Sequence, residues 1–386
     1  MKIWVPNQTD SDETRVAMVP SVVKRLADLN VQIVVEAGAG DGAHQTDDAF
    51  EHAGAMIASA TEAITHWADA DMTLTIGPIS TEQAGTLKPK SLLVGMLAPM
   101  KHVELIAALA ARNVTTFSME FLPRISRAQA ADVLSSQANM AGYVSVILAA
   151  RQCPKIFPMM MTAAGTIAPS KIFVIGAGVA GLQAIATAKR LGARVEAYDV
   201  RPVVKEQVES LGARFIELPA RQADAQTEGG YASEQTDEQR EKQQELMART
   251  IIAADCVITT AAIFGKAPPL LIDHDVVAQM HAGDVIVDMA ADTDTGRGNC
   301  AATQPGQTVV TDQGVTVVGE TNLPGLVPAH ASLAYANNMR SFLTELFDDN
   351  GNLALDMNDE LIKGPTITHD GQVVNEMVKN AMSESN

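Results

Sequence analysis

The chain has 386 residues and a formal net charge of −18, with 19% charged and 47% hydrophobic residues. This balance is typical of a globular protein, and the length favours two domains, each with its own core. The negative charge argues against binding to nucleic acid or to anionic lipid through bulk electrostatics, so we expect no nucleic-acid partner.

The cysteines and histidines carry no metal or disulfide signature. Cys153, Cys256 and Cys300 are widely spaced and form no CxxC motif, which is typical of a reducing compartment. The eight histidines are scattered and include no HExxH motif, so we expect no metal site. Because the first residues form an expected strand and lack the apolar core of a signal peptide, we expect a cytoplasmic protein.

Short strand-like and helix-like runs alternate through the first 120 residues. Such alternation predicts a parallel sheet with helices on its faces. The glycine-rich residues 38–42 have the wrong spacing for a phosphate loop and predict only a turn. The runs, in chain order, are residues 2–5, 22–29, 32–36, 47–53, 72–76, 92–97, 103–111 and 115–119.

Two segments with helical spacing, residues 126–150 and 325–344, are expected to connect the domains. Between the first of them and the second domain, residues 157–188 are almost free of charge. Pro158, Pro169 and a glycine turn divide that stretch into strand and helix lengths, so we expect no membrane span.

The most informative motif is Gly176-Ala177-Gly178-Val179-Ala180-Gly181. It follows the apolar run 171–175 and opens a helix-like stretch over 182–191. Asp199 then closes the next apolar run, residues 195–198. A strand, glycine turn, helix, second strand and terminal acid together predict a dinucleotide-binding unit, whereas a GxGxxG motif alone is weak evidence.

Each part of this unit has a physical role. Gly176 permits the tight turn, Gly178 lets the backbone approach a pyrophosphate, and Gly181 lets the helix pack closely on its strand. The Asp199 carboxylate can accept hydrogen bonds from both ribose hydroxyls and would repel a 2′-phosphate, which favours NAD(H) over NADP(H). Arg201 leaves NADP(H) open, since an arginine can pair with that phosphate. An empty Rossmann-like turn with a solvated acid is the other alternative.

Six strand-like runs from residue 171 onward predict a complete dinucleotide-binding domain. One long polar stretch, residues 219–253, interrupts their series. Within that stretch, Gly229-Gly230-Tyr231 precedes a helix-prone segment, which predicts either a mobile loop at about 219–240 or a solvated excursion. The expected strands are residues 172–175, 194–198, 214–216, 256–260, 285–288 and 315–318.

We therefore expect an α/β fold with two Rossmann-like, doubly wound parallel-sheet domains joined by long helices. Residues 1–125 with about 345–386 would form the N-terminal domain, and 151–324 the NAD-binding domain.

The chain resembles, over essentially its whole length, the NAD(H)-binding alpha subunits of proton-translocating nicotinamide nucleotide transhydrogenases. The family is related to alanine dehydrogenase. The segments that carry the resemblance are 13–17, 122–129, 132–137, 157–166, 176–190 and 229–232.

The resemblance implies a division of labour. This subunit would bind NADH, a partner component would bind NADP(H), and a transmembrane component would couple proton translocation to direct hydride transfer between the two nicotinamides. It also implies a homodimer that is peripheral to the inner membrane through its partner subunits. Hydride transfer depends mainly on positioning, because the cofactor supplies the chemistry.

The resemblance further implies the site residues. Arg124, Gln129, Asp132 and Ser135 would surround the nicotinamide, with Arg127 one helical turn from Arg124. Taken alone, Asp132 and Ser135 favour a surface hydrogen bond or ion pair instead. Relatives commonly have leucine where Ala262 stands, which implies a looser contact. The other implied NAD contacts are Ile125, Ser126, Arg127, Gly176, Gly178, Val179, Gly181, Asp199, Val200, Arg201, Gly230, Tyr231 and Ala262.

Two rival functions stay open. An alanine dehydrogenase would hold its keto acid with a lysine and a histidine near residues 73–78 and 95–99, but neither segment here contains either residue. An NADH-sensing module would do no chemistry and would not need an exposed polar cluster around Gln129.

Overall fold

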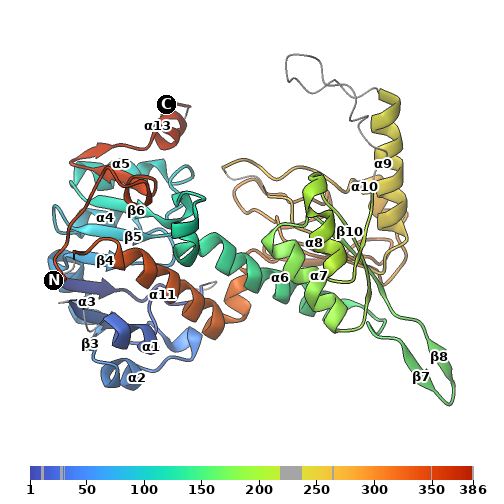
Figure 1. Cartoon of the computed structure of the whole chain (residues 1–386), viewed down its shortest axis with the longest axis horizontal. Coiled ribbons are helices and arrows are strands. Elements are labelled where there is room, and N and C mark those ends of the chain that lie inside the picture. Colours follow the sequence, from blue (N-terminus) through green and yellow to red (C-terminus); the bar gives the residue numbers. More distant parts are fainter. Residues whose placement is uncertain are drawn as a thin grey trace. The chain divides into compact units, whose positions relative to one another are not determined.

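The computed structural model describes residues 1–9, 13–26, 29, 31–217, 237–262, 265–348 and 350–384. The chain divides into two compact units (Figure 1), the first formed by Met1–Gln137 with Pro324–Asn386 and the second by Ala138–Leu323. Residues 126–137 and 325–344, which were predicted as parts of connecting helices, belong to the first unit.

The first unit is built on an eight-stranded sheet in the order β17-β16-β6-β5-β4-β1-β2-β3. Strands β1 to β6 are parallel, and the two strands from the C-terminal segment form antiparallel pairs, β16 with β6 and β17 with β16. Because β1 pairs with both β2 and β4, the winding direction reverses there, as in a doubly wound sheet. The strands are β1 (Lys2–Val5), β2 (Gln32–Glu36), β3 (Met56–Ala58), β4 (Met72–Leu74), β5 (Leu92–Gly95), β6 (Thr115–Ser118), β16 (Thr366–His369) and β17 (Gln372–Val373).

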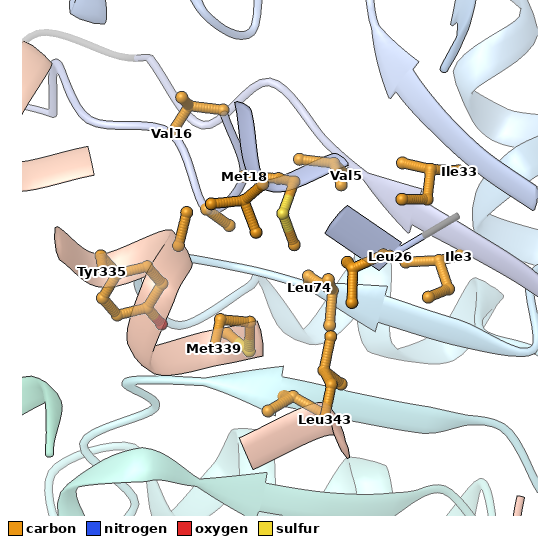
Figure 2. Packing of buried hydrophobic residues seen from close by; sticks show 14 of the residues in the cluster. Ile3, Val5, Val16, Met18, Leu26, Ile33, Leu74, Tyr335, Met339 and Leu343 are labelled. Carbon is orange, nitrogen blue, oxygen red and sulfur yellow. The ribbon is translucent and has the colours of Figure 1, made fainter. Parts of the chain in front are cut away.

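Side-chain alternation along β1 supplies both faces of this sheet. Ile3 and Val5 enter one apolar cluster, to which α1, α2 and α11 contribute, whereas Trp4 enters a second cluster with α3, α4, α5 and α13. Figure 2 shows Tyr335 of α11 in the first cluster. The helices are α1 (Pro20–Val23), α2 (Asp47–His52), α3 (Ala60–Asp69), α4 (Thr81–Thr86), α5 (Val103–Ala111), α11 (Pro328–Thr344), α12 (Glu360–Lys363) and α13 (Glu376–Glu384).

Several elements of this unit were not predicted from the sequence, namely β3, the two antiparallel strands, α12, α13 and the helices α3 and α4. Both of these helices begin with a capping box, in which Ser59 pairs with Glu62 and Ser80 with Gln83. That spacing is visible in the sequence and marks a helix start.

The second unit is built on a seven-stranded sheet in the order β11-β10-β9-β12-β13-β15-β14. All six predicted strands are present and parallel, and the Rossmann-like prediction is confirmed. Strand β14, antiparallel at one edge, was not predicted. The strands are β9 (Lys171–Ile175), β10 (Arg194–Tyr198), β11 (Arg214–Phe215), β12 (Cys256–Thr259), β13 (Val285–Asp288), β14 (Thr308–Val310) and β15 (Thr316–Val318). The helices are α7 (Val179–Arg190), α8 (Lys205–Ser210), α9 (Asp237–Ile252) and α10 (His274–Val277).

Helix α6 (Val133–Gln152) runs from the end of the first unit's amino-terminal part into the second unit. The helix expected over 126–150 is thus interrupted, because residues Ser126–Ala131 form a separate 3₁₀ helix. Among the described helices, α6 alone is long and apolar enough to cross a bilayer, and slightly under half of it is buried. The expectation from the sequence concerned residues 157–188 instead. A partly buried core helix passes the same test, so this is weak evidence for a span.

A two-stranded hairpin, β7 (Met160–Thr162) with β8 (Gly165–Ile167), forms a small antiparallel sheet of its own. Figure 1 shows it extending from the body of the second unit. Both strands are exposed along their whole length. This hairpin was not predicted as an element.

Candidate functional site

The glycine turn lies at the carboxyl end of β9, where the winding of the second sheet reverses between β9 and β12. Ligands of doubly wound sheets bind at such a point. Gly176 has φ +98°, and a Cβ there would overlap the Thr260 hydroxyl. Glycine is therefore required on two grounds, backbone conformation and space.

The other two glycines of the motif differ in what surrounds them. A Cβ on Gly181 would overlap the Gly176 carbonyl oxygen, so the first turns of α7 pack directly on the glycine turn. Among the described residues other than its chain neighbours, only Arg201 would have an atom within 4 Å of a Cβ on Gly178, namely Nη2 at 3.9 Å. Gly178 caps α7 without a side-chain hydrogen bond to the helix amides, and Val179 beside it is 40% exposed. This open helix start can receive an anion.

Asp199 links the end of β10 to the glycine turn. Its Oδ2 accepts a hydrogen bond from the Ala177 amide at 2.7 Å and one from Arg201 Nη2 at 3.0 Å. Its Oδ1 accepts from the Arg201 amide at 2.8 Å and from Arg201 Nε at 2.9 Å. Partial burial alone would raise the pKa of Asp199, but the hydrogen bonds from Arg201 and Ala177 outweigh it and hold that pKa below its ordinary value. The carboxylate is therefore ionised and fixed.

The structure thus brings together the turn, Asp199 and Arg201. Val200 is exposed beside them, and Ala262 is exposed after β12. Gly230 and Tyr231 lie outside the described residues.

Two buried polar residues that were not predicted as part of the site support this edge of the sheet. The Asn299 amide group donates to the Ala261 carbonyl at 2.9 Å and accepts from the Ala261 amide at 3.1 Å, which fixes the backbone before Ala262. Asp288, at the end of β13, accepts hydrogen bonds from the hydroxyls of Thr259 and Thr303. An acid that ends an apolar run was the available signal for Asp288.

Gly142 of α6 is a third residue that sequence reasoning missed. A Cβ there would overlap the Ala180 carbonyl oxygen, so α6 packs backbone to backbone on the first turn of α7. The signal was a glycine within a helical apolar pattern, a position that usually has a packing reason.

In the first unit, Asp132 caps α6. Its Oδ1 accepts from the Ser135 amide at 2.9 Å and its Oδ2 from the Ser135 hydroxyl at 2.6 Å. These two expected nicotinamide residues therefore bond to each other in a helix cap.

The remaining residues of this segment divide into paired and unpaired side chains. Arg127 donates to Asp359 and lies 3.9 Å from Glu345, so its guanidinium is engaged within the unit. Arg124 and Gln129 are exposed, and their side chains have no hydrogen-bond or ion-pair partner within the part of the chain that the structure describes. Ser126 is also exposed, and Ile125 is half-buried.

Close to this segment in the first unit is a buried cluster, Arg15, Glu13 and Gln137. Arg15 Nε and Nη2 donate to the two Glu13 carboxylate oxygens at 2.8 and 2.7 Å, and Nη1 donates to Gln137 Oε1 at 2.9 Å. The Gln137 amide nitrogen donates in turn to the Ala331 carbonyl of α11 at 3.1 Å. Arg15 is only 8% exposed, so its charge is committed to this cluster.

The carboxyl edge of the first sheet is occupied by its own side chains. Gln8, after β1, accepts from the Ile76 amide at 2.6 Å, beyond the end of β4. Glu120 accepts from the amides of Leu97 and Ala98 at 3.2 and 2.7 Å, beyond the end of β5. Burial raises the pKa of Glu120 although these hydrogen bonds oppose the shift.

Among the described residues, no three histidine, cysteine, aspartate or glutamate side chains are grouped to hold a metal ion.

Comparison with known proteins agrees with this geometry. The model of the family "Alanine dehydrogenase/PNT, N-terminal domain" matches residues 4–141, and that of the C-terminal domain matches residues 145–376. The chain is 45% identical over 382 residues to an NAD(P) transhydrogenase subunit alpha protein of Rhodospirillum rubrum, covering 97% of this chain and 98% of that protein. A transhydrogenase structure from Sinorhizobium meliloti matches with a TM-score of 0.86 and 43% identity, over 97% of this chain and 100% of that one. An L-alanine dehydrogenase structure, 23% identical over the full length of both chains with a TM-score of 0.82, is similar in fold.

Proposed function

This chain belongs to the alanine dehydrogenase/PNT family and, within it, to the alpha subunits of NAD(P) transhydrogenase, and from that premise we propose that it binds NAD(H) for direct hydride transfer to NADP⁺. The NADP(H) is held by a partner component. A transmembrane component couples the transfer to proton translocation. The observation that carries the proposal is the open glycine turn at the reversal point of the second sheet, beside an ionised Asp199.

The residues of the turn fit a dinucleotide. Gly178 leaves space for a pyrophosphate at the amides of α7, and the N-terminal end of a helix dipole favours negative charge. Asp199 is the acceptor for the ribose hydroxyls, with Val179 and Val200 as exposed apolar neighbours. Gly176 and Gly181 keep the turn compact. Bound NADH supplies the hydride, and the chain holds and orients it.

The nicotinamide end is assigned to Arg124 and Gln129. Both side chains are exposed and have no partner among the described residues, so their donors are available to a carboxamide or a ribose. Asp132 and Ser135 act by capping α6 and fixing the backbone that follows Gln129. Ile125, Ser126 and Arg127 complete the proposed contact segment, although Arg127 is held by Asp359.

Family membership supports the proposed partner arrangement. We place the subunit in the cytoplasm, peripheral to the inner membrane through the NADP(H)-binding and transmembrane components. Helix α6 belongs to the protein body in this proposal, because it packs on α7 through Gly142.

We further propose a homodimer. The hairpin β7–β8 and the residue before it expose four large apolar side chains, which is unusual for a surface that contacts only water. We propose a second copy of the chain as the partner that covers this surface, because it is always present at the same concentration as the first. The exposed side chains are those of Met159, Met160, Met161 and Ile167.

The test is NADH-dependent reduction of an NADP⁺ analogue by the chain with and without membranes that carry the other transhydrogenase components. Transfer only with the membranes is the expected result. Gln129→Asn should slow transfer by about tenfold or more with little change in NADH affinity, because its amide acts on orientation. The matched control is Gln183→Asn on α7, whose side chain bonds Thr187 within its own helix.

Other outcomes would favour the rival functions. Alanine-driven reduction of NAD⁺ by the chain alone would indicate an alanine dehydrogenase. Against it stands the absence of lysine and histidine from residues 73–78 and 95–99. NADH binding without any transfer would indicate an NADH-sensing module.

A further inference from the structure

Arg201 fills the acceptor positions that a bound ribose would need. Described residues donate four hydrogen bonds to the Asp199 carboxylate, and three of them come from Arg201, two from its guanidinium. The fourth comes from the Ala177 amide. An ionised carboxylate offers about four acceptor positions, so none is left for ribose hydroxyls while the guanidinium stays in place.

The two partners differ in their freedom to move. The Asp199 side chain is only 6% exposed, whereas that of Arg201 is 56% exposed. Backbone amides on both sides hold the carboxylate, but only the carboxylate holds the guanidinium among the contacts of the described residues. The guanidinium is therefore the part that can leave.

The position of the guanidinium adds a second constraint. Leaving aside the neighbours of Gly178 in the chain, Arg201 Nη2 is the one atom of the described residues within 4 Å of where a Gly178 Cβ would stand, so it lies over the open middle of the glycine turn. A dinucleotide that approaches this turn brings its phosphates to the same place.

We propose that Arg201 is an internal competitor of the adenosine ribose, which must leave Asp199 before the ribose hydroxyls can bind and which then pairs with the ligand phosphates beside Gly178. The inference rests on the proposed NAD(H) site. It makes Arg201 a specificity residue that disfavours ligands with a ribose but no phosphate. The guanidinium exchanges one anionic partner, the Asp199 carboxylate, for another, the ligand phosphate. This step therefore lowers the affinity for a phosphate-bearing ligand only a little.

The test compares adenosine with ADP-ribose by calorimetry on the full chain, in the wild type, Arg201→Ala and Arg201→Gln. Both variants should bind adenosine about fivefold more tightly than the wild type, as expected for removal of a partly exposed ion pair. ADP-ribose should gain less or lose affinity. The matched control is Arg214→Ala, which removes an exposed arginine paired with Glu196 in the same sheet.

Ionic strength gives a readout that a merely structural role would not move. Adenosine is uncharged, so salt acts only on the ion pair of the protein. Raising the salt concentration should tighten adenosine binding to the wild type and leave Arg201→Ala unchanged. Unchanged or weaker adenosine binding in both variants, in a protein whose wild type binds NADH, would overturn the competitor role alone. A wild type that binds neither NADH nor ADP-ribose would overturn the proposed function and this inference together.

Discussion

The six parallel strands follow the same order in the two units, but the units differ at the edge where such folds bind ligands. In each, the first strand lies between the second and the fourth, so the winding reverses at β1 and β4 in one unit and at β9 and β12 in the other. In the second unit this edge is open at Gly178. In the first unit Gln8 and Glu120 bind the backbone that follows the strands.

This difference shows that topology supplies a place for a ligand and side chains decide whether it is available. A glycine turn exposes amides, whereas a glutamine or glutamate at the same kind of edge consumes them. The nucleotide is therefore proposed in one unit, although both have the topology for it.

The largest effect is expected from distorting the glycine turn. In Gly181→Ala the added methyl group overlaps the Gly176 carbonyl oxygen, so the start of α7 must shift. We expect NADH affinity to fall by about 100-fold. The control is Gly77→Ala after β4, where a Cβ would have no atom within 4 Å among the described residues beyond its chain neighbours. Fluorescence titration with NADH measures both variants, and equal losses would mean that the two edges do not differ.

The next effect concerns Asp199. Asp199→Asn should weaken NAD⁺ binding by about 30-fold, because hydrogen bonds to a charged acceptor are lost. Asp255→Asn is the matched control, since Asp255 also accepts a backbone amide, that of Lys171, but at the amino end of the same sheet. If calorimetry shows that both variants lose the same affinity for NAD⁺, the ligand does not bind at Asp199.

The same carboxyl group has a pH signature. Its folded pKa is lowered, so its contribution to stability is present above the ordinary pKa of 3.8 and is lost as the pH falls through the folded value. The difference in unfolding free energy between wild type and Asp199→Asn should therefore narrow below about pH 4. A difference that stays constant down to strongly acidic pH would contradict the lowered pKa.

Much of the fold was predictable because local signals agree with the tertiary structure. The central parallel strands of the second sheet, β9, β12 and β13, are apolar runs that are buried almost along their whole length, and such runs are visible in the sequence. Strand β14 lacks this signal, because its Val310 is exposed at the edge. Strand β3 is equally short and exposes Met56.

Only those parts of the site that depend on residues close together in the sequence were predictable. The glycine turn is a local motif, and the cap formed by Asp132 and Ser135 follows from an acid placed before a helical run. The contact of Arg15 with Gln137 joins residues 122 positions apart, and nothing local indicates it. The pairing of Arg201 with Asp199 depends on a rotamer, which spacing does not determine.

A smaller effect separates two arginines of the first unit. Arg15→Met should lower the unfolding free energy by about 1.5 kcal/mol, because Glu13 and Gln137 lose a buried charged partner. Arg124→Met should change it by less than about 0.5 kcal/mol, since that side chain is exposed and unpaired among the described residues. Denaturant unfolding measures stability, and the coupled transhydrogenase assay should show slower transfer for Arg124→Met. A stability loss in Arg124→Met as large as in Arg15→Met would contradict the distinction between Arg15, which stabilises the fold, and Arg124, which is available to a ligand.

The smallest effect is expected at the hairpin of the second unit. Met161 is 74% exposed on β7, so Met161→Glu leaves the folded chain intact but places a charge on the surface proposed to meet a second copy. We expect the dimer to dissociate about fivefold more readily, as sedimentation equilibrium would show. Met377→Glu on α13 of the first unit is the matched control, because that methionine is also exposed, at 52%. A wild type that sediments as a monomer, or two variants that weaken the dimer equally, would mean that the hairpin is not the interface. The proposed difference between the two units would then concern ligand binding and not dimer formation.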